Sequence, residues 1–400
     1  MSKTIRLVVF NESYWGKGLI YSQNILPLKK LANETGSQIE LFSFTSILKL
    51  FLERKSITEF RVMMAKEGVT VKNFPVFFYP ARVFLLRYFL IPYFYMNVAP
   101  YVWFLRNKDK NIDVVYNLRS YATSLAFYKF YHDYNKLIFD PRTDWIEENV
   151  NAGNIKPEGE TVRFWNRMEG EFVRRFKKSI FTSETFRDNV ITKHNIKETD
   201  KYEIVYNPID YSLFTIEKVP HMGKCFLYTG SFGRWNKLET YLDFFKSIFA
   251  NDSTCSMVIC TSSSHTKVEK IISSVKYNSI RNAVKVYYNV SIDDLPKYYA
   301  MCDYGLQLMT KKDSRVGVKY VEYVAAGITP IVSENVQGAA YIARKYSLGI
   351  VLPSDINLGN NYTVISEAKT IDVNSISYNK FRDVSDLNRI SQLLKHIYFY

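Results

Sequence analysis

The sequence is poor in the residues that build metal centres and cross-linked domains. Its 400 residues include four cysteines and five histidines, with no Cys-x-x-Cys pair and no Asp-x-Asp. The histidines are scattered, and each cysteine lies in or beside an apolar run. We therefore expect no metal site, and we expect buried free thiols in a reducing cytoplasm at Cys225, Cys255, Cys260 and Cys302.

Targeting and nucleic-acid signals are also missing. The chain begins with a strand-like run at residues 5–10 rather than with a signal peptide. Its basic residues are spread along the sequence instead of forming one long block, which argues against a nucleic-acid-binding protein. The net charge of +14 then points to anionic substrates or to an anionic membrane surface.

The second half of the chain alternates regularly between strand-like and helical segments. With 47% hydrophobic content, 400 residues are enough for two cores. Strands separated by helix-length segments pair in parallel and form an open α/β sheet. The expected strands span 225–229, 256–261, 284–288, 304–308, 329–332 and 349–352, and the expected helices span 237–250, 265–275, 292–301, 318–326 and 338–345.

The first half repeats this pattern. Its expected strands span 5–10, 39–44, 69–71, 114–116, 137–139 and 179–182, and its helices span 20–32, 57–66, much of 81–105, 123–131, 162–176 and 185–193. We predict two Rossmann-like doubly wound domains that face each other across a cleft, with ligands bound beyond the carboxyl ends of the strands. The expected domains are residues 1–203 and 204–383, with a helix at 384–400 that packs back on the first domain.

Residues 313–333 are the most informative stretch. They read as a loop ending in Gly317, a short helix carrying Lys319 and Glu322, and a buried strand. A lysine in the first helical turn is unfavourable beside the helix dipole, unless an anion lies between them. A carboxylate one turn later can bind a pair of sugar hydroxyls, so the arrangement suits a nucleotide-sugar. The alternative is an ordinary exposed ion pair within the helix.

Two glycine-containing loops follow predicted strands. The loop with Gly230 and Gly233 lets backbone approach a phosphate, and Arg234 and Lys237 add positive charge; the alternative is a solvated helix start. On the other domain, two glycines after the first strand either serve an acceptor in the same way or form a plain turn. These acceptor-side candidates are Gly16 and Gly18.

Polar residues also follow the strand at 137–139. Arg142 is a candidate for binding an acceptor phosphate with two hydrogen bonds, and Asp140 is a candidate catalytic base or the cap of a turn. Arg119, after the strand at 114–116, is a weaker candidate for the same place. We expect three other acidic residues to be surface charges, namely Glu147, Glu148 and Glu169.

Residues 83–105 are nearly uncharged and reach the ~20 residues that a transmembrane helix needs. Arg87, Asn97 and two prolines argue against a span, as do the predicted strands of one sheet on both sides. We expect helices that are partly core and partly an aromatic surface. That surface could rest on anionic lipid, with a large buried helix pair as the alternative. The flanking basic residues are Arg82, Arg106, Lys108 and Lys110.

Four stretches together carry a family resemblance: 139–148, 205–214, 228–239 and 317–330. In this order they resemble glycosyltransferases of the GT-B fold, similar to the retaining family 4 enzymes of bacterial capsule and lipopolysaccharide assembly. The resemblance implies a cytoplasmic, peripheral membrane hexosyltransferase without metal or cofactor. It would move a sugar from a nucleotide-sugar to a growing or polyprenyl-diphosphate-linked glycan at the inner membrane face.

The chain departs from the family's motifs at several positions, among them Gly317 in place of a proline and the shifted basic residues Arg234 and Lys237, and two departures concern carboxylate and histidine positions of the site. The second carboxylate of the family's Glu-x7-Glu pair, which binds the nucleotide ribose, corresponds to Glu322, but the first, which approaches the donor sugar, is Ser314. Phe139 stands where the family often has a histidine. Two other functions therefore remain open: a catalytically idle GT-B scaffold subunit of a polysaccharide assembly complex, and another GT-B activity such as a nucleotide-sugar epimerase or an inverting transferase.

Overall fold

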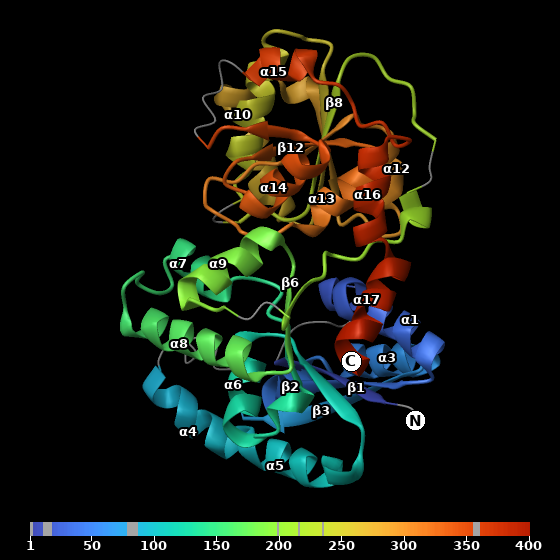
Figure 1. The fold of residues 1–400 in the computed structure, drawn as a ribbon. Helices are drawn as coiled ribbons and strands as arrows, with labels where there is room; N and C mark the ends of the chain where they lie inside the picture. Colours follow the sequence, from blue (N-terminus) through green and yellow to red (C-terminus); the bar gives the residue numbers. More distant parts are fainter. Residues whose placement is uncertain are drawn as a thin grey trace. The chain divides into compact units, whose positions relative to one another are not determined.

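The computed structural model describes residues 3–10, 18–77, 87–197, 200–214, 217–233, 236–354 and 361–400 (Figure 1). The chain forms two compact units. The first comprises Met1–Pro208 together with Leu387–Tyr400, and the second comprises Ile209–Asp386. Compared with the predicted boundaries, the first segment of this unit ends later, at 208 instead of 203, and the chain returns later, at 387 instead of 384.

The first unit is built on a seven-stranded sheet in the order β3-β2-β1-β4-β5-β6-β7. All neighbouring strands pair in parallel, which confirms the α/β expectation. The strands are β1 (Thr4–Phe10), β2 (Gln38–Ser46), β3 (Val69–Val76), β4 (Val114–Leu118), β5 (Leu137–Phe139), β6 (Lys178–Phe181) and β7 (Tyr202–Ile204).

Both faces of this sheet are covered by helices, because alternate residues of β1 enter two different cores (Figure 1). Val8 and Phe10 face α4 (Arg87–Asn97), α5 (Ala99–Lys108), α6 (Tyr121–Phe130), α8 (Glu160–Arg175) and α9 (Glu184–His194). Leu7 and Val9 face α1 (Leu26–Thr35), α3 (Arg54–Lys66) and α17 (Leu387–Phe399). Two short helices complete the unit, α2 (Ile47–Leu52) and α7 (Trp145–Asn151).

The last helix, α17, packs against α1 and belongs to the core of the first unit. Its apolar stripe of Ile390, Leu394 and Ile397 is buried. Lys3 and Lys177 donate hydrogen bonds of 3.0 and 3.2 Å to the carbonyl oxygen of Tyr398. Cations beside the last carbonyls of a helix also complement its dipole, so these lysines hold the end of the chain on the first sheet.

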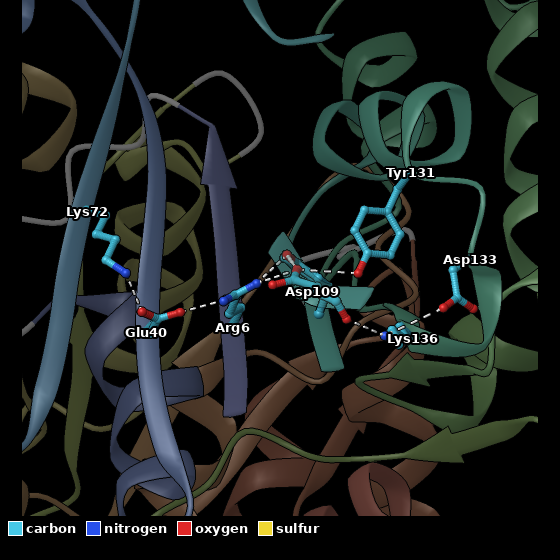
Figure 2. A network of polar contacts seen from close by, with 8 residues as sticks. Arg6, Glu40, Lys72, Asp109, Tyr131, Asp133 and Lys136 are labelled. Atoms are coloured by element: carbon cyan, nitrogen blue, oxygen red, sulfur yellow. Dashed lines mark hydrogen bonds and ion pairs between the residues drawn. The ribbon is translucent and has the colours of Figure 1, made fainter. Parts of the chain in front are cut away.

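A row of charged residues crosses one face of the first sheet near the start of its strands (Figure 2). Arg6 on β1 lies 2.6 Å from Glu40 Oε2 on the neighbouring strand β2, and 2.5 Å from Asp109 Oδ2. Lys72 on β3 pairs with the other Glu40 oxygen. The hydroxyl of Tyr116, opposite Arg6 on β4, donates to Asp109. Because Arg6 and Asp109 are almost fully buried, this network must stay complete for the sheet to be stable.

The second unit contains a six-stranded parallel sheet in the order β10-β9-β8-β11-β12-β13. Its strands are β8 (Cys225–Thr229), β9 (Ser256–Thr261), β10 (Val284–Tyr288), β11 (Tyr304–Gln307), β12 (Thr329–Ser333) and β13 (Ile350–Leu352). Its helices are α10 (Leu238–Phe249), α11 (His265–Ile272), α12 (Leu295–Ala300), α13 (Val318–Ala325), α14 (Gln337–Tyr346), α15 (Asn361–Glu367) and α16 (Ile376–Ser385). The sequence predicted every one of these strands but missed α15 and α16. All four cysteines are free and buried, as expected.

The strand orders fix where ligands can bind. In each sheet the order reverses beside the first strand of the unit, between β1 and β4 and between β8 and β11. This is the switch point of a doubly wound sheet, where ligands bind at the carboxyl ends of the strands. Candidate ligand-binding residues are therefore expected in the loops after β4 and β5 and in those after β8 and β11.

Helices α4 and α5 bear out the expectation of a mixed segment. Leu90, Phe94 and Val102 are fully buried in the core of the first unit. Four neighbours are exposed and form what we term the aromatic surface: Tyr95, Met96, Trp103 and Phe104. In the described part of the chain, no helix combines the length and the apolar character that crossing a bilayer requires.

The Arg6 network provides a test of the fold. We expect Arg6→Met to destabilise the protein by about 3–5 kcal/mol, because it leaves the buried carboxylate of Asp109 without its cation. The matched control is Lys55→Met, which removes a cation that is 90% exposed and 4.0 Å from Glu59, and should cost less than about 1 kcal/mol. Urea unfolding of both variants measures the difference; equal losses would contradict a structural role for the network.

Candidate functional site

The first candidate site lies where β8 of the second unit ends. Gly230 has a φ of +115°, a conformation that side chains rarely adopt. Its N–H donates to the carbonyl of Cys260 on β9 at 2.8 Å, and the N–H of Phe232 donates to Ser263 Oγ at 2.8 Å. The hydroxyl of Tyr228, on β8, donates to the carbonyl of Ser231 at 2.8 Å. The loop after β8 is therefore fixed against the neighbouring strand.

Lys319 reaches this loop from the first turn of α13. Its Nζ lies 4.8 Å from the centre of the Tyr228 ring, within the range of a cation–π contact. A Cβ atom at Gly230 would lie 2.7 Å from Lys319 Cε and 3.0 Å from Nζ. A side chain at position 230 would therefore displace the amine and strain the backbone, and the structure brings two sequence-predicted residues into contact.

Burial decides the electrostatics of Lys319. It lowers the pKa of the amine to about 8, against the opposing effect of Glu322. Lys319 and Glu322, both within the described residues, do not form an ion pair, so the alternative of an exposed intrahelical pair is wrong. A partly buried amine with no carboxylate in contact among the described residues favours an added anion, which would restore its charged form.

Glu322 lies one turn further along α13. Its Oε2 accepts a hydrogen bond of 2.8 Å from the hydroxyl of Tyr299 on α12. Burial raises the pKa of Glu322, while Tyr299 and Lys319 act in the opposite direction. The hydrogen bond from a buried tyrosine thus holds one carboxylate oxygen in place and fixes the orientation of the group.

Helix α13 begins where the sequence predicted. Gly317 is its N-cap residue, with extended backbone and no capping side chain. A Cβ atom at Gly317 would lie 2.6 Å from Nε2 of Gln307, the last residue of β11. Glycine thus lets the start of α13 approach the end of β11, at the switch point of the sheet. Ser314, in the loop before, is buried, and its carbonyl oxygen would lie 2.5 Å from a Cβ atom at Gly338 of α14.

The other donor-side candidates stay apart from this contact. Gly233 and Lys237 are both exposed. A Cβ atom at Gly233 would meet nothing within 4 Å, so its glycine is not sterically required. Lys237 is the N-cap residue of α10. Arg234 lies outside the described residues.

The second candidate site lies at the carboxyl ends of β4 and β5 in the first unit. Asp140, directly after β5, is fully buried. Its Oδ2 accepts hydrogen bonds of 3.0 Å from Asn24 and 2.9 Å from Asn117, and its Oδ1 lies 2.8 Å from Nε of Arg142. Arg142 is 7% exposed and has a φ of +57°, unusual for a residue with a side chain.

Arg119 joins the same network from the end of β4. One of its terminal nitrogens donates to Asn24 Oδ1, and the other donates to Gln23 Oε1 at 2.9 Å. Gln23 in turn donates to Asn207 at 2.8 Å. The structure therefore brings Asp140, Arg142 and Arg119 together through amide side chains.

The remaining predictions for the first unit have mixed outcomes. Gly18 is exposed, with nothing within 4 Å of an added Cβ, and Gly16 lies outside the described residues. The expectation that Glu169 is a surface charge is wrong. It is fully buried and accepts hydrogen bonds from Lys193 and His194 at 2.6 Å, and from Tyr121. Glu169 lies among the apolar residues that form the buried stripe of α8, and this position in the sequence could have predicted its burial. Glu147 and Glu148 are partly exposed.

Several residues of the two sites were not singled out in the sequence. Asn117 carried a signal, since it is a polar residue inside the otherwise apolar strand β4. Nothing in the sequence distinguished Tyr228 and Tyr299 as site residues, because tyrosines are frequent in this chain. Tyr398 on α17, whose hydroxyl accepts from Asn117 at 2.6 Å, could not be connected to a site so distant in sequence. Within the described ranges, no three or more His, Cys, Asp or Glu residues are grouped so that they could hold a metal ion.

The comparison with family models concerns the second unit. Residues 212–358, which make up most of that unit, match the model of the glycosyl transferases group 1. No curated protein shows significant similarity to the chain. The unit that holds Gly230, Lys319 and Glu322 is thus similar to the glycosyl transferases group 1 over most of its length.

Solved structures share the fold of the whole chain. A glycosyltransferase from Rickettsia africae is 15% identical with a TM-score of 0.64, over 99% of this chain and 98% of its own. HepE of Anabaena, in complex with UDP-glucose, is 14% identical with a TM-score of 0.64, over 98% of each chain. WaaG, a glycosyltransferase involved in lipopolysaccharide biosynthesis, is 12% identical with a TM-score of 0.61, over 99% of each. The resemblance to GT-B glycosyltransferases and the two-domain Rossmann-like fold are confirmed.

The contact between Gly230 and Lys319 can be tested with a matched pair of glycines from one loop. We expect Gly230→Ala to destabilise the protein by about 1–3 kcal/mol, because the new methyl group meets Lys319 and the backbone is strained. Gly233→Ala should change stability by less than about 0.5 kcal/mol. Both are measured by urea unfolding. If Gly230→Ala is as harmless as Gly233→Ala, the contact does not exist in solution.

Proposed function

We propose that the chain is a retaining, metal-independent glycosyltransferase of the hexosyltransferase type. It takes a sugar from a nucleotide-sugar and transfers it to a growing or polyprenyl-diphosphate-linked glycan of the cell surface, at the cytoplasmic face of the plasma membrane. The observation that carries the proposal is the partly buried Lys319 amine against the Gly230 backbone, with Glu322 one turn away on α13. The family match of this unit supports it.

The donor diphosphate would lie beside Lys319 and the first turn of α13. Helix N-termini offer unpaired N–H groups and a partial positive charge, which suit a phosphate. As the bond to the sugar breaks, negative charge builds on the leaving diphosphate, and a cation fixed in a poorly solvated place stabilises that charge. The amine and the helix supply this stabilisation from the protein itself, so the proposal requires no metal ion.

The nucleoside would be held by Glu322. Its carboxylate is oriented by Tyr299 and can accept hydrogen bonds from two ribose hydroxyls. HepE, with the same fold, is described in complex with UDP and with UDP-glucose, which supports a nucleoside diphosphate sugar as donor. The retaining outcome is taken from the family resemblance, and the anomeric configuration of the product, read by NMR, is the measurement that decides it.

The acceptor proposal draws on charge and on the exposed surface of the first unit. WaaG acts in lipopolysaccharide biosynthesis, where glycans grow on lipid carriers. In this chain, the aromatic surface on α4 and α5 is followed by Arg106 and Lys108 in the last turn of α5. Helix α2 exposes a second apolar set, Ile47, Leu48, Phe51 and Leu52. Aromatic side chains beside cations suit the headgroup region of an anionic membrane.

The donor site is tested by nucleotide binding. In a thermal-shift panel of UDP, GDP, CDP and ADP, one nucleotide should stabilise the protein, by ~2.7 kcal/mol at 100 times its dissociation constant. Lys319→Met and Glu322→Ala should remove this stabilisation, whereas Glu239→Ala, an exposed carboxylate on α10, should not. Because protonated Lys319 binds the diphosphate, affinity should fall as the pH rises above about 8. Full affinity in Glu322→Ala would rule out this site.

Activity separates the alternatives once a nucleotide is known. Purified protein supplied with the matching nucleotide-sugar should release nucleoside diphosphate, by transfer or slow hydrolysis. Nucleotide binding without turnover over a broad acceptor panel would indicate an idle scaffold subunit instead. Conversion of the donor to its epimer without loss of the nucleotide would indicate an epimerase.

The membrane contact is tested with vesicles. We expect the protein to sediment with vesicles that contain anionic phosphatidylglycerol and less with pure phosphatidylcholine, since each nearby Lys or Arg adds ~1 kcal/mol at an anionic surface. Trp103→Ser with Phe104→Ser should reduce binding several-fold. Val275→Ser, which removes an exposed apolar side chain from the second unit, should leave it unchanged. Equal binding by all three proteins would contradict a role for the aromatic surface.

A further inference from the structure

The guanidinium of Arg142 has more hydrogen-bonding capacity than the first unit uses. An arginine has five N–H donors and is always charged. Here the side chain is 5% exposed, and the carboxylate that pairs with it among the described residues is that of Asp140. Nε lies 2.8 Å from Asp140 Oδ1, but without hydrogen-bond geometry. Nε and Nη1 are therefore buried donors without an acceptor among the described residues.

Such a group is costly in a folded protein. A buried polar atom left without a partner costs about 1–3 kcal/mol, and more when it is charged. Asp140 lowers the cost of the buried charge but does not satisfy these donors, because its Oδ2 accepts from Asn24 and Asn117 and its Oδ1 lies beside Nε without hydrogen-bond geometry. The left-handed backbone of Arg142 adds strain. Strain and unused donors at one buried residue are typical of a binding site rather than of a structural ion pair.

The surroundings hold Arg142 in place. Asp140 is fixed by two amides that come from the segment before α1 and from β4, and Asn117 also donates to the Tyr398 hydroxyl on α17. Asn24 further accepts from Arg119. The carboxylate is thus anchored from three elements, and its contact with Nε orients the guanidinium. We therefore assign Asp140 as a positioning residue rather than as a free catalytic base.

We propose that Arg142 binds an oxyanion, a phosphate or carboxylate group, of the acceptor substrate. A planar guanidinium matches both groups with two parallel hydrogen bonds, and charge-assisted bonds are the stronger ones. The position directly after β5, next to the switch point of the first sheet, is where a ligand of this unit binds. The inference rests on the proposed glycosyl transfer only in naming the ligand as the acceptor.

The test separates this site from the donor site. Inorganic phosphate is titrated calorimetrically into full-length Lys319→Met protein, in which phosphate binding by the second unit is weakened, so that a further loss on changing Arg142 reports on the first unit. The comparison protein also carries Arg142→Gln and Asp140→Asn, which remove both charges together and leave no lone buried ion. The matched control carries Arg175→Gln, which removes an exposed arginine paired with Glu171. Circular dichroism confirms that each protein is folded.

We expect saturable phosphate binding in Lys319→Met and in the Arg175→Gln control, and at least tenfold weaker binding in the Arg142→Gln/Asp140→Asn protein. Arg142→Lys should bind with intermediate affinity, because the charge remains but the planar fork is lost. Acetate and glucuronate in separate titrations distinguish a carboxylate from a phosphate, and glucose serves as the neutral probe. Equal phosphate affinity in all proteins, or binding of glucose and of no anion, would overturn the proposal. Neither result bears on nucleotide binding by the second unit.

Discussion

The structure of the second unit depends on one close approach, that of an amine to a backbone without a side chain. Lys319 can lie over the Tyr228 ring only because Gly230 leaves the space free and adopts a backbone that other residues avoid. The same contact fixes where α13 starts relative to the end of β8, since Lys319 is in the first turn of that helix. Gly317 likewise allows a close approach, in this case of the start of α13 to the side chain of Gln307. Two glycines thus place one helix N-terminus and one cation at the same edge of the sheet.

The two units stabilise the cations of their candidate sites, Lys319 and Arg142, by different interactions. In the second unit, burial lowers the pKa of Lys319, and an aromatic ring rather than a carboxylate lies beneath the amine. In the first unit, Arg142 cannot lose its proton, and Asp140, held by two amides, accompanies it. Lysine suits a place where charge appears during a reaction, while arginine suits permanent recognition of an anion. The proposed roles in donor activation and acceptor binding follow this difference.

The sequence was a good guide to the sheets and a partial guide to the sites. Short apolar runs such as Met257–Cys260 predicted strands covered on both faces, and regular spacing predicted their parallel pairing. Gly317, Lys319 and Glu322 were identifiable because a lysine in a first turn contradicts local helix preference. Contacts across long sequence distances were not identifiable: Tyr228 beneath Lys319, and Tyr398 beside Asn117. The prediction for Glu169 was wrong because it considered the charge of the residue and not its position on the buried stripe of α8. The helices α15 and α16 were not predicted because their part of the sequence lacks a clear helical periodicity.

The return of the chain in α17 has a consequence for biogenesis. The first sheet and its polar network are made almost entirely from residues before 208, yet Tyr398 contacts Asn117, and the α17 stripe closes the core behind β1. During synthesis, the ribosome must finish the whole second unit before this segment emerges. The early half of the protein therefore leaves an apolar face open while the second unit is translated. A chaperone that shields that face in the interval therefore acts on a first unit that already contains its sheet but still lacks the helix that covers one side of it.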